Sequence, residues 1–181
     1  MKVLQNIKLK LQEFILSEAF KKKPITLIFR LITLFLFTIL RTNFKYKARI
    51  RNSEFIYTCK YYKVSGLGGR GQFIFREFYE DFFKIAESLL PKKFNFIDVG
   101  CSRGFFSMYL LSLQNFKSRG VCIDPLKKAI ADFSEILNLN KLKNVILING
   151  VISNKISKKI NLFRVNENQG YYSIVKDLSY A

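Results

Sequence analysis

The residues best suited to chemistry are two acids, Asp98 and Asp124, each of which ends a short apolar run. Asp98 begins the sequence Asp-Val-Gly-Cys-Ser-Arg-Gly, in which Gly100 and Gly104 bound a turn. A phosphate-binding loop would continue with Gly-Lys-Ser/Thr and a nicotinamide site would carry Gly-x-Gly-x-x-Gly, and this stretch has neither pattern. A carboxylate at this point repels a pyrophosphate and attracts a cation. The pattern therefore favours a positively charged ligand.

A strand, a turn and a helix must position the first acid. Residues 94–99 form a short apolar run rich in strand formers, which predicts a buried strand. From Phe105 the apolar residues recur at helical spacing. A strand that passes through a tight glycine turn into a helix directs unpaired backbone N–H groups at one place. We therefore expect a polar ligand to lie against residues 100–104.

The second acid and a following asparagine extend the candidate site. Residues 119–124 predict another short strand, which Asp124 ends and Pro125 stops. In a parallel nucleoside-binding sheet, an acid about 20 residues beyond the glycine turn binds the ribose hydroxyls. The third strand, 144–152, places Asn149 where an adenine edge would lie, although Asn before Gly is also a common turn.

A ligand with a ribose, an adenine and a cationic centre fits these three positions. S-adenosyl-L-methionine carries an α-ammonium and a sulfonium as well as an adenosine. We predict S-adenosyl-L-methionine as the cofactor and expect six residues to bind it. The predicted cofactor-binding residues are Asp98, Gly100, Ser102, Gly104, Asp124 and Asn149.

The stretches Asp98–Gly104, Val121–Pro125 and Asn144–Ser153 together resemble the first half of a class I S-adenosylmethionine-dependent methyltransferase. More narrowly, the chain from Gln72 onward is similar to the FkbM family, whose members are mostly O-methyltransferases acting on sugars and other hydroxylated metabolites. The family's Asp-Val-Gly-Ala-Asn-x-Gly is partly kept, because Cys101 and Ser102 replace Ala and Asn. Its usual Glu-Pro at the second strand is Asp124-Pro125 here.

The resemblance implies an α/β fold with a Rossmann-like sheet, in which helices flank parallel strands. It also implies a small-molecule or glycan substrate. The family continues with a further strand of the type Lys-Ile-Asp-Val-Glu-Gly, which this sequence lacks. We therefore expect an incomplete sheet, from a truncated or naturally short chain, preceded by an N-terminal helical extension. No catalytic base is identified, and the catalytic residues stay unknown.

The charge of the chain is strongly positive and unevenly distributed. The formal net charge is +18, from 31 Lys and Arg against 13 Asp and Glu. Residues 1–63 hold 14 of the basic residues and 3 of the acids. Such a field favours anionic partners, although a Lys-rich composition alone could produce it. An RNA methyltransferase is therefore the alternative enzyme, suggested by charge alone, but without a recognised module we do not expect nucleic acid as the partner.

The cysteine and histidine content limits the chemistry. Cys59, Cys101 and Cys122 are scattered, which indicates a reducing compartment and no disulfide framework. The chain has no histidine, so Ser-His-Asp and Cys-His nucleophiles and His-bearing zinc sites are excluded. We predict no metal site and a cytoplasmic location, peripheral on the inner face of the membrane.

The apolar segment 25–40 is the basis for the membrane prediction. It is bounded by Lys21–Lys23 and Arg41, and it is shorter than the roughly 20 residues that a spanning helix needs. Its polar residues gather into one narrow stripe on a helix: Thr26, Arg30, Thr33 and Arg41. A helix in the membrane interface fits best. Packing within the protein or in an oligomer, and a true span, are the alternatives.

The remaining segments complete the expected organisation. We predict a basic N-terminal extension over 1–63, with residues 1–41 contacting a membrane surface, and a partial methyltransferase domain over 64–181. Alternation over 42–63 predicts short antiparallel strands, and 72–90 predicts one helix. Residues 160–165 and 171–175 predict a further strand pair. A non-catalytic, truncated, membrane-associated fragment is the alternative to an enzyme.

Overall fold

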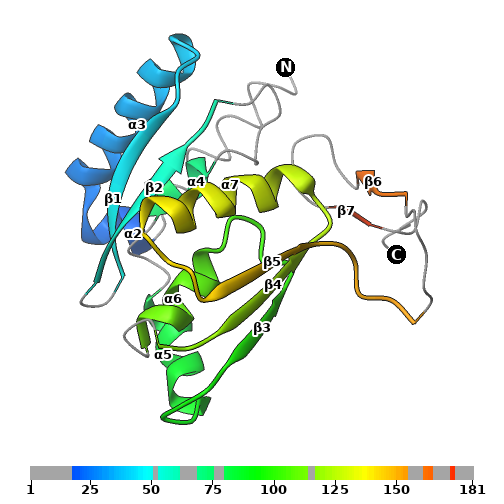
Figure 1. The fold of residues 1–181 in the computed structure, drawn as a ribbon. Coiled ribbons are helices and arrows are strands. Elements are labelled where there is room, and N and C mark those ends of the chain that lie inside the picture. Colours follow the sequence, from blue (N-terminus) through cyan, green and yellow to red (C-terminus); the bar gives the residue numbers. More distant parts are fainter. Residues whose placement is uncertain are drawn as a thin grey trace, which may run out of the picture.

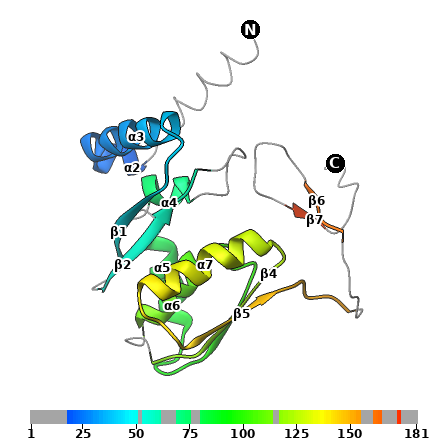
Figure 2. The same cartoon turned by 45° about the horizontal axis from the view of Figure 1, so that its top comes forward.

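A computed structural model describes residues 18–50, 53–61, 69–75, 80–113, 117–154, 161–164 and 172–173 (Figure 1). The first 17 residues of the expected N-terminal helical extension lie outside the described residues. The described part is an α/β structure, in which a parallel three-stranded sheet and an antiparallel hairpin lie on either side of helix α7 (Lys127–Leu139) (Figure 2).

The parallel sheet positions the candidate site. Strands β3 (Phe96–Val99), β4 (Gly120–Asp124) and β5 (Val145–Asn149) lie side by side in chain order and run in the same direction. Helix α6 (Phe105–Leu113) connects β3 to β4, and α7 (Lys127–Leu139) connects β4 to β5. Such strand-helix-strand crossovers are what parallel pairing requires. This arrangement confirms the predicted α/β class and is compatible with part of a Rossmann-like sheet.

One face of this sheet is covered and the other is open. Residues on the covered face include Cys122, which is fully buried, and both α6 and α7 contact β4. The alternate residues point to the other side, where the apolar side chains stay exposed. The most exposed of them are Ile97 at 68%, Val99 at 58%, Ile146 at 62% and Ile148 at 43%.

The antiparallel hairpin consists of β1 (Phe44–Ile50) and β2 (Ser53–Cys59), as the alternation over 42–63 predicted. It is joined to the rest of the protein at several points. Asn140, just after α7, accepts from the backbone N–H of Ile56 at 2.9 Å and donates to its carbonyl at 2.9 Å. Hairpin residues such as Tyr57 share one continuous core with Phe133 and Met108. The domain boundary at residue 63 stays a prediction.

The N-terminal helices lie against the hairpin. Helix α2 (Glu18–Lys22) leads into α3 (Pro24–Ile39), in which Pro24 occupies the first turn, where a missing N–H costs nothing. Phe37 of α3 stacks on Phe44 of β1, with ring centroids 4.2 Å apart. Within the described residues, no helix has both the length and the apolar character needed to cross a membrane.

Helix is present on both sides of the middle of the stretch 72–90, over which one helix was predicted. The structure has α4 (Arg70–Phe75) and α5 (Glu80–Leu89), with residues 76–79 outside the described part. Whether the helix is continuous through residues 76–79 stays a prediction. The expected late strand pair is confirmed but short, with β6 (Phe163–Arg164) antiparallel to β7 (Tyr172–Ser173).

Candidate functional site

The carboxyl ends of the three parallel strands meet at one edge of the sheet (Figure 1). β3 leads there into the turn before α6, β4 ends at Asp124, and β5 ends at Asn149, which is the register partner of Asp124. Ligands in open α/β sheets bind at this kind of edge. The predicted site residues therefore lie in one neighbourhood, although 51 positions separate the first from the last in sequence.

The turn of residues 100–104 takes unusual backbone angles at three places. Gly100 and Gly104 have φ of +79° and +73°, and Ser102 has +49°. Glycine adopts this region without strain, and a serine does so at a cost. The N–H groups of Gly100 and Cys101 both donate to the carbonyl of Ile123, at 2.8 and 3.2 Å.

The prediction that this turn offers unpaired N–H groups to a ligand is therefore wrong for most of its residues. Besides the two bonds to Ile123, Gly104 donates to the carbonyl of Cys101 at 2.8 Å, and Ser102 donates to Asp124. These bonds hold the turn against the end of β4. The turn is rigid before any ligand arrives.

The two glycines of the turn have opposite surroundings. A Cβ atom built on Gly104 would lie 2.0 Å from the ring of Phe133, which is fully buried on α7. A Cβ atom built on Gly100 would meet nothing within 4 Å. Gly104 thus allows helix α7 to approach the turn. Gly100 presents bare backbone to open space, where a ligand can approach.

Asp98 is half-buried on the covered face of β3. Its Oδ2 accepts a hydrogen bond from the Ser107 hydroxyl at 2.5 Å, and that hydroxyl also contacts the Cys122 sulfur at 3.2 Å. Burial raises the pKa of the Asp98 carboxyl above 3.8, the hydrogen bond from Ser107 opposes this rise, and repulsion from Asp124 adds to it. A cation beside Asp98 would relieve both the burial cost and the repulsion.

Asp124 lies at the end of β4, on the same face of the sheet as Asp98. It is only 6% exposed. Its Oδ2 accepts the N–H of Ser102 at 2.9 Å, and its Oδ1 accepts the N–H of Leu126 at 2.8 Å. The carboxylate thus fixes both the glycine turn and the start of α7. The observed contacts give it a structural role in addition to the ribose contact predicted for it.

Asn149 differs from its predicted role. Its side-chain amide donates to the carbonyls of Asp124 at 3.0 Å and Pro125 at 2.9 Å, and the Gly150 N–H also donates to Asp124, at 3.1 Å. Both amide hydrogens are therefore used within the protein. In this structure the side chain joins the ends of β4 and β5 and cannot donate to an adenine.

Arg103 is a residue of this region that the sequence reasoning missed. It is 4% exposed and reaches away from the turn to the hairpin, where its Nη2 donates to the carbonyl of Thr58 at 2.5 Å and to its hydroxyl at 2.8 Å. Its Nε lies 3.3 Å from Asp132 Oδ2 on α7. Lys60 also pairs with Asp132, at 2.7 Å, and with Glu135. In the sequence, the only indication of a buried partner for Arg103 was Asp132, which lies on the otherwise apolar face of α7.

Cys101 is buried, and nothing in its surroundings makes it a nucleophile. Its hydrogen bond with Cys122, its burial and the charges of Asp124 and Asp98 raise the pKa of the Cys101 thiol. A thiol that stays protonated reacts slowly. We therefore interpret Cys101 as a packing residue. Hydrogen bonds with Cys101 and Ser107 lower the pKa of the Cys122 thiol, but Cys122 is fully buried and no substrate can reach it.

A wide hollow lies at the opposite end of the sheet. Its volume is about 1060 Å³, and its lining includes Asn95, Arg119, Lys141 and Lys143, next to the amino ends of the strands. It contains none of the predicted site residues. The topological argument places a nucleoside at the carboxyl ends, so we do not assign this hollow to the cofactor.

Comparison with known proteins gives little further identification. No family model matches the chain, and no curated protein matches it. One similar solved structure is a SAM-dependent methyltransferase from Aquifex aeolicus, 26% identical over 40% of this chain and 37% of that chain, with a TM-score of 0.32. The matched part thus spans little more than a third of that structure, and this TM-score is too low to establish a shared fold.

Proposed function

We propose that this chain binds S-adenosyl-L-methionine at the carboxyl ends of β3 and β4 and acts as a methyltransferase. The observation that carries the proposal is the placement of Asp98 and Asp124 on one face of adjacent parallel strands, joined through the turn that exposes Gly100. This combination suits a ligand that is both nucleoside-like and positively charged.

Each described residue would contribute differently to binding. Asp98 supplies negative charge for the α-ammonium or the sulfonium. Gly100 lets the ligand lie against the backbone, because no side chain occupies that space. Asp124 keeps the turn in its shape through the N–H of Ser102, and a ribose hydroxyl can bind at the small part of the carboxylate that is exposed.

The cofactor, when bound, supplies an electrophilic methyl group on a sulfonium. The protein's part in such a displacement is to align the acceptor oxygen with the methyl carbon and to exclude water. Following the resemblance to the FkbM family, we propose a sugar or another hydroxylated metabolite as the acceptor. Among the described residues we assign none to remove the hydroxyl proton.

Isothermal titration of the full chain with S-adenosyl-L-methionine tests the proposal. We expect a dissociation constant between about 1 μM and 1 mM, the usual range for enzyme substrates. Asp98→Asn preserves size and removes the charge, so binding should weaken by roughly tenfold to a hundredfold, as for a lost charged hydrogen bond. Asp124→Ala should weaken it as well, by loosening the turn.

A matched control is Glu54→Gln, which removes an exposed acid of the hairpin that pairs with Lys47. It should leave the affinity unchanged. Far-UV circular dichroism should show that all variants are folded. Absence of binding by the folded wild-type chain, or equal binding by Asp98→Asn, would contradict the proposal.

A further inference from the structure

Helix α3 exposes an apolar face along its whole length. Eight large side chains on its outward side are exposed by about half or more. They are Ile25 at 82%, Ile28 at 46%, Phe29 at 70%, Ile32 at 53%, Phe35 at 64%, Leu36 at 52%, Ile39 at 60% and Leu40 at 67%. At 100° per residue they share one side of the helix without a polar residue among them. A contiguous apolar surface of this extent on a soluble protein marks a site of contact with a membrane or a partner.

The polar residues of α3 are not on this outward face. Arg30 is 4% exposed and donates from Nη1 to the carbonyl of Ile74 in α4 at 2.9 Å. Thr33 and Thr38 donate to carbonyls one turn earlier, Phe29 at 2.9 Å and Leu34 at 2.7 Å. Of the expected polar stripe, Arg30 is buried against the protein and Thr33 is partly buried, whereas Thr26 and Arg41 are exposed beside the apolar face. The protein thus buries the less apolar side of the helix. A surface helix normally does the reverse.

Cationic residues mark both ends of α3. Lys21, Lys22 and Lys23 precede it and Arg41 follows it, and all four are exposed. Every charged residue from position 19 to position 53 is a Lys or an Arg. Lys and Arg side chains reach from an apolar region toward anionic headgroups, to which their charges are attracted.

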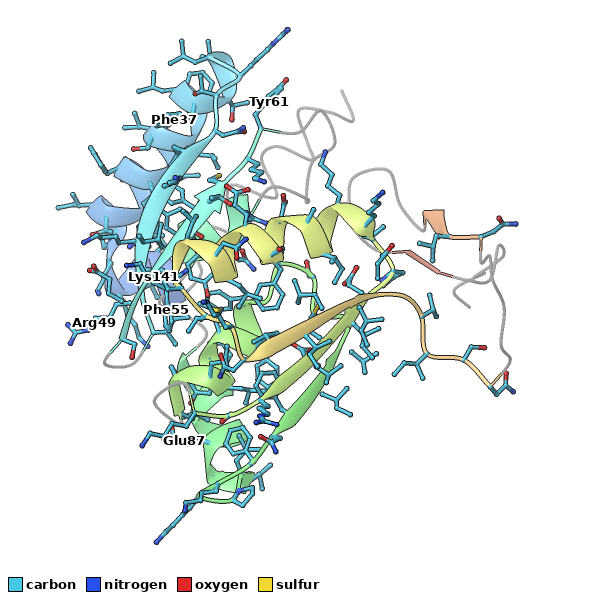
Figure 3. All side chains as sticks on the ribbon, viewed as in Figure 1. Phe37, Arg49, Phe55, Tyr61, Glu87 and Lys141 are labelled. Atoms are coloured by element: carbon cyan, nitrogen blue, oxygen red, sulfur yellow. The ribbon has the colours of Figure 1, made fainter. Side chains whose placement is uncertain are left out.

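We propose that the outward face of α3 inserts into the interface of an anionic lipid bilayer, with the rest of the protein on the water side. Two views agree that α3 lies at the outer edge of the molecule, beyond the hairpin (Figures 1 and 2). Its side chains project toward the hairpin, where Phe37 lies, and away from the protein (Figure 3). At 16 residues the helix is about 24 Å long, so it lies along the interface.

The charges argue against a second copy of the chain as the occupant. If two α3 helices packed in parallel, they would bring two sets of Lys21–Lys23 together. If they packed antiparallel, those lysines would lie beside Arg41 of the other copy. Each arrangement juxtaposes like charges, which is unfavourable at an interface. An anionic lipid surface instead complements both ends of the helix at once.

Flotation of the full chain with vesicles tests the proposal. Binding should be strong to phosphatidylcholine vesicles containing roughly a third phosphatidylglycerol, and weaker to phosphatidylcholine alone. Phe29→Ser/Phe35→Ser should lower the partition coefficient by at least about tenfold, because it removes two exposed apolar side chains without touching the core. Ile97→Ser/Ile146→Ser is the matched control on the open sheet face, and it should leave partitioning unchanged.

A fluorescent reporter locates the inserted face. The chain has no tryptophan, so Phe35→Trp gives a single signal, which should shift to the blue and be quenched by brominated lipids. Ile148→Trp, on the sheet, should respond to neither. The proposal is overturned if the wild-type chain stays with the water phase, or if the double serine variant floats equally. It is also overturned if sedimentation without vesicles shows a dimer that the same variant dissociates.

Discussion

The two ends of the three-stranded sheet differ in charge, in packing and in the amount of open space. The carboxyl end carries Asp98 on β3 and Asp124 on β4, next to the turn of residues 100–104, whose N–H groups bind the end of β4. The amino end opens into a hollow of about 1060 Å³ lined in part by Arg119, Lys141 and Lys143. This hollow and the two acids therefore lie at opposite ends of the sheet. The proposed site therefore follows from the topology of the sheet and the chemistry of the two acids, not from the volume of the hollow.

The largest effect should come from filling a glycine at each end. Gly104→Ala combines a φ of +73° with a contact of 2.0 Å to Phe133, which is fully buried and has no room to move. We expect a loss of about 3–5 kcal/mol in the free energy of unfolding, from backbone strain and overpacking together. Urea denaturation measures it.

The matched substitution at the amino end is Gly120→Ala. Its Cβ would lie 2.4 Å from the ring of Phe96, which is partly exposed and can rotate away. We expect a loss of about 1–2 kcal/mol. Equal losses at the two ends would mean that Phe133 is not the rigid neighbour that the structure indicates.

A second contrast concerns arginines of the two ends. Arg103→Met removes the buried contacts with Thr58 and Asp132 and should cost about 3 kcal/mol, as breaking a buried ion pair usually does. Arg119→Met, at the exposed amino end, should change stability by less than about 0.5 kcal/mol. Thermal unfolding of both variants checks the difference. A neutral Arg103→Met would mean that the hairpin is held on the core by other contacts.

The sequence predicted the elements around the site better than the contacts between them. Strands β3, β4 and β5 and helix α6 follow from local apolar patterns, which a single stretch of chain contains. The bond from Arg103 to Thr58 spans 45 positions and the bond from Lys60 to Asp132 spans 72. No period or motif encodes which distant polar groups meet, because that depends on how the elements pack.

The dependence on packing also explains why the structure adds a structural role for Asp124 and changes the role expected of Asn149. Asp124 and Asn149 were placed correctly at the ends of β4 and β5. Whether their polar atoms face a ligand or the backbone depends on the turn of residues 100–104 and on Pro125. Turn geometry with φ of +49° at Ser102 is not readable from a serine, which seldom adopts it.

The smallest effect should be the pH dependence that Asp98 contributes. Its pKa is raised above 3.8 in the folded state, first by burial, so the folded chain holds this proton more tightly than the unfolded chain. The contribution of Asp98 to the free energy of unfolding is therefore greatest below the ordinary pKa of an aspartate, and it is lost as the pH rises through the raised pKa. The Asp98→Asn variant has no titrating group at this position and so lacks this pH-dependent contribution. The stability of the wild-type chain relative to the variant should fall as the pH rises from acid to neutral, in urea titrations at each pH.

A ligand at Asp98 should reverse that trend. A bound cation favours the ionised carboxylate, so affinity for S-adenosyl-L-methionine should decrease as the pH falls through the raised pKa of Asp98. Affinity in the Asp98→Asn variant should be weaker and independent of pH over the same range. Titration calorimetry at several pH values measures both. A wild-type affinity that does not vary with pH would remove Asp98 from the cation contact.

Glycine-selective nitrogen-15 labelling tests the central claim most directly, because the nine glycines include reporters at both ends of the sheet. On addition of S-adenosyl-L-homocysteine or S-adenosyl-L-methionine, the amide signals of Gly100, Gly104 and Gly150 should shift in a saturable manner, and that of Gly120 should not. Saturable shifts at Gly120 alone would move the site to the basic hollow, and no shift at any glycine would contradict cofactor binding by this chain.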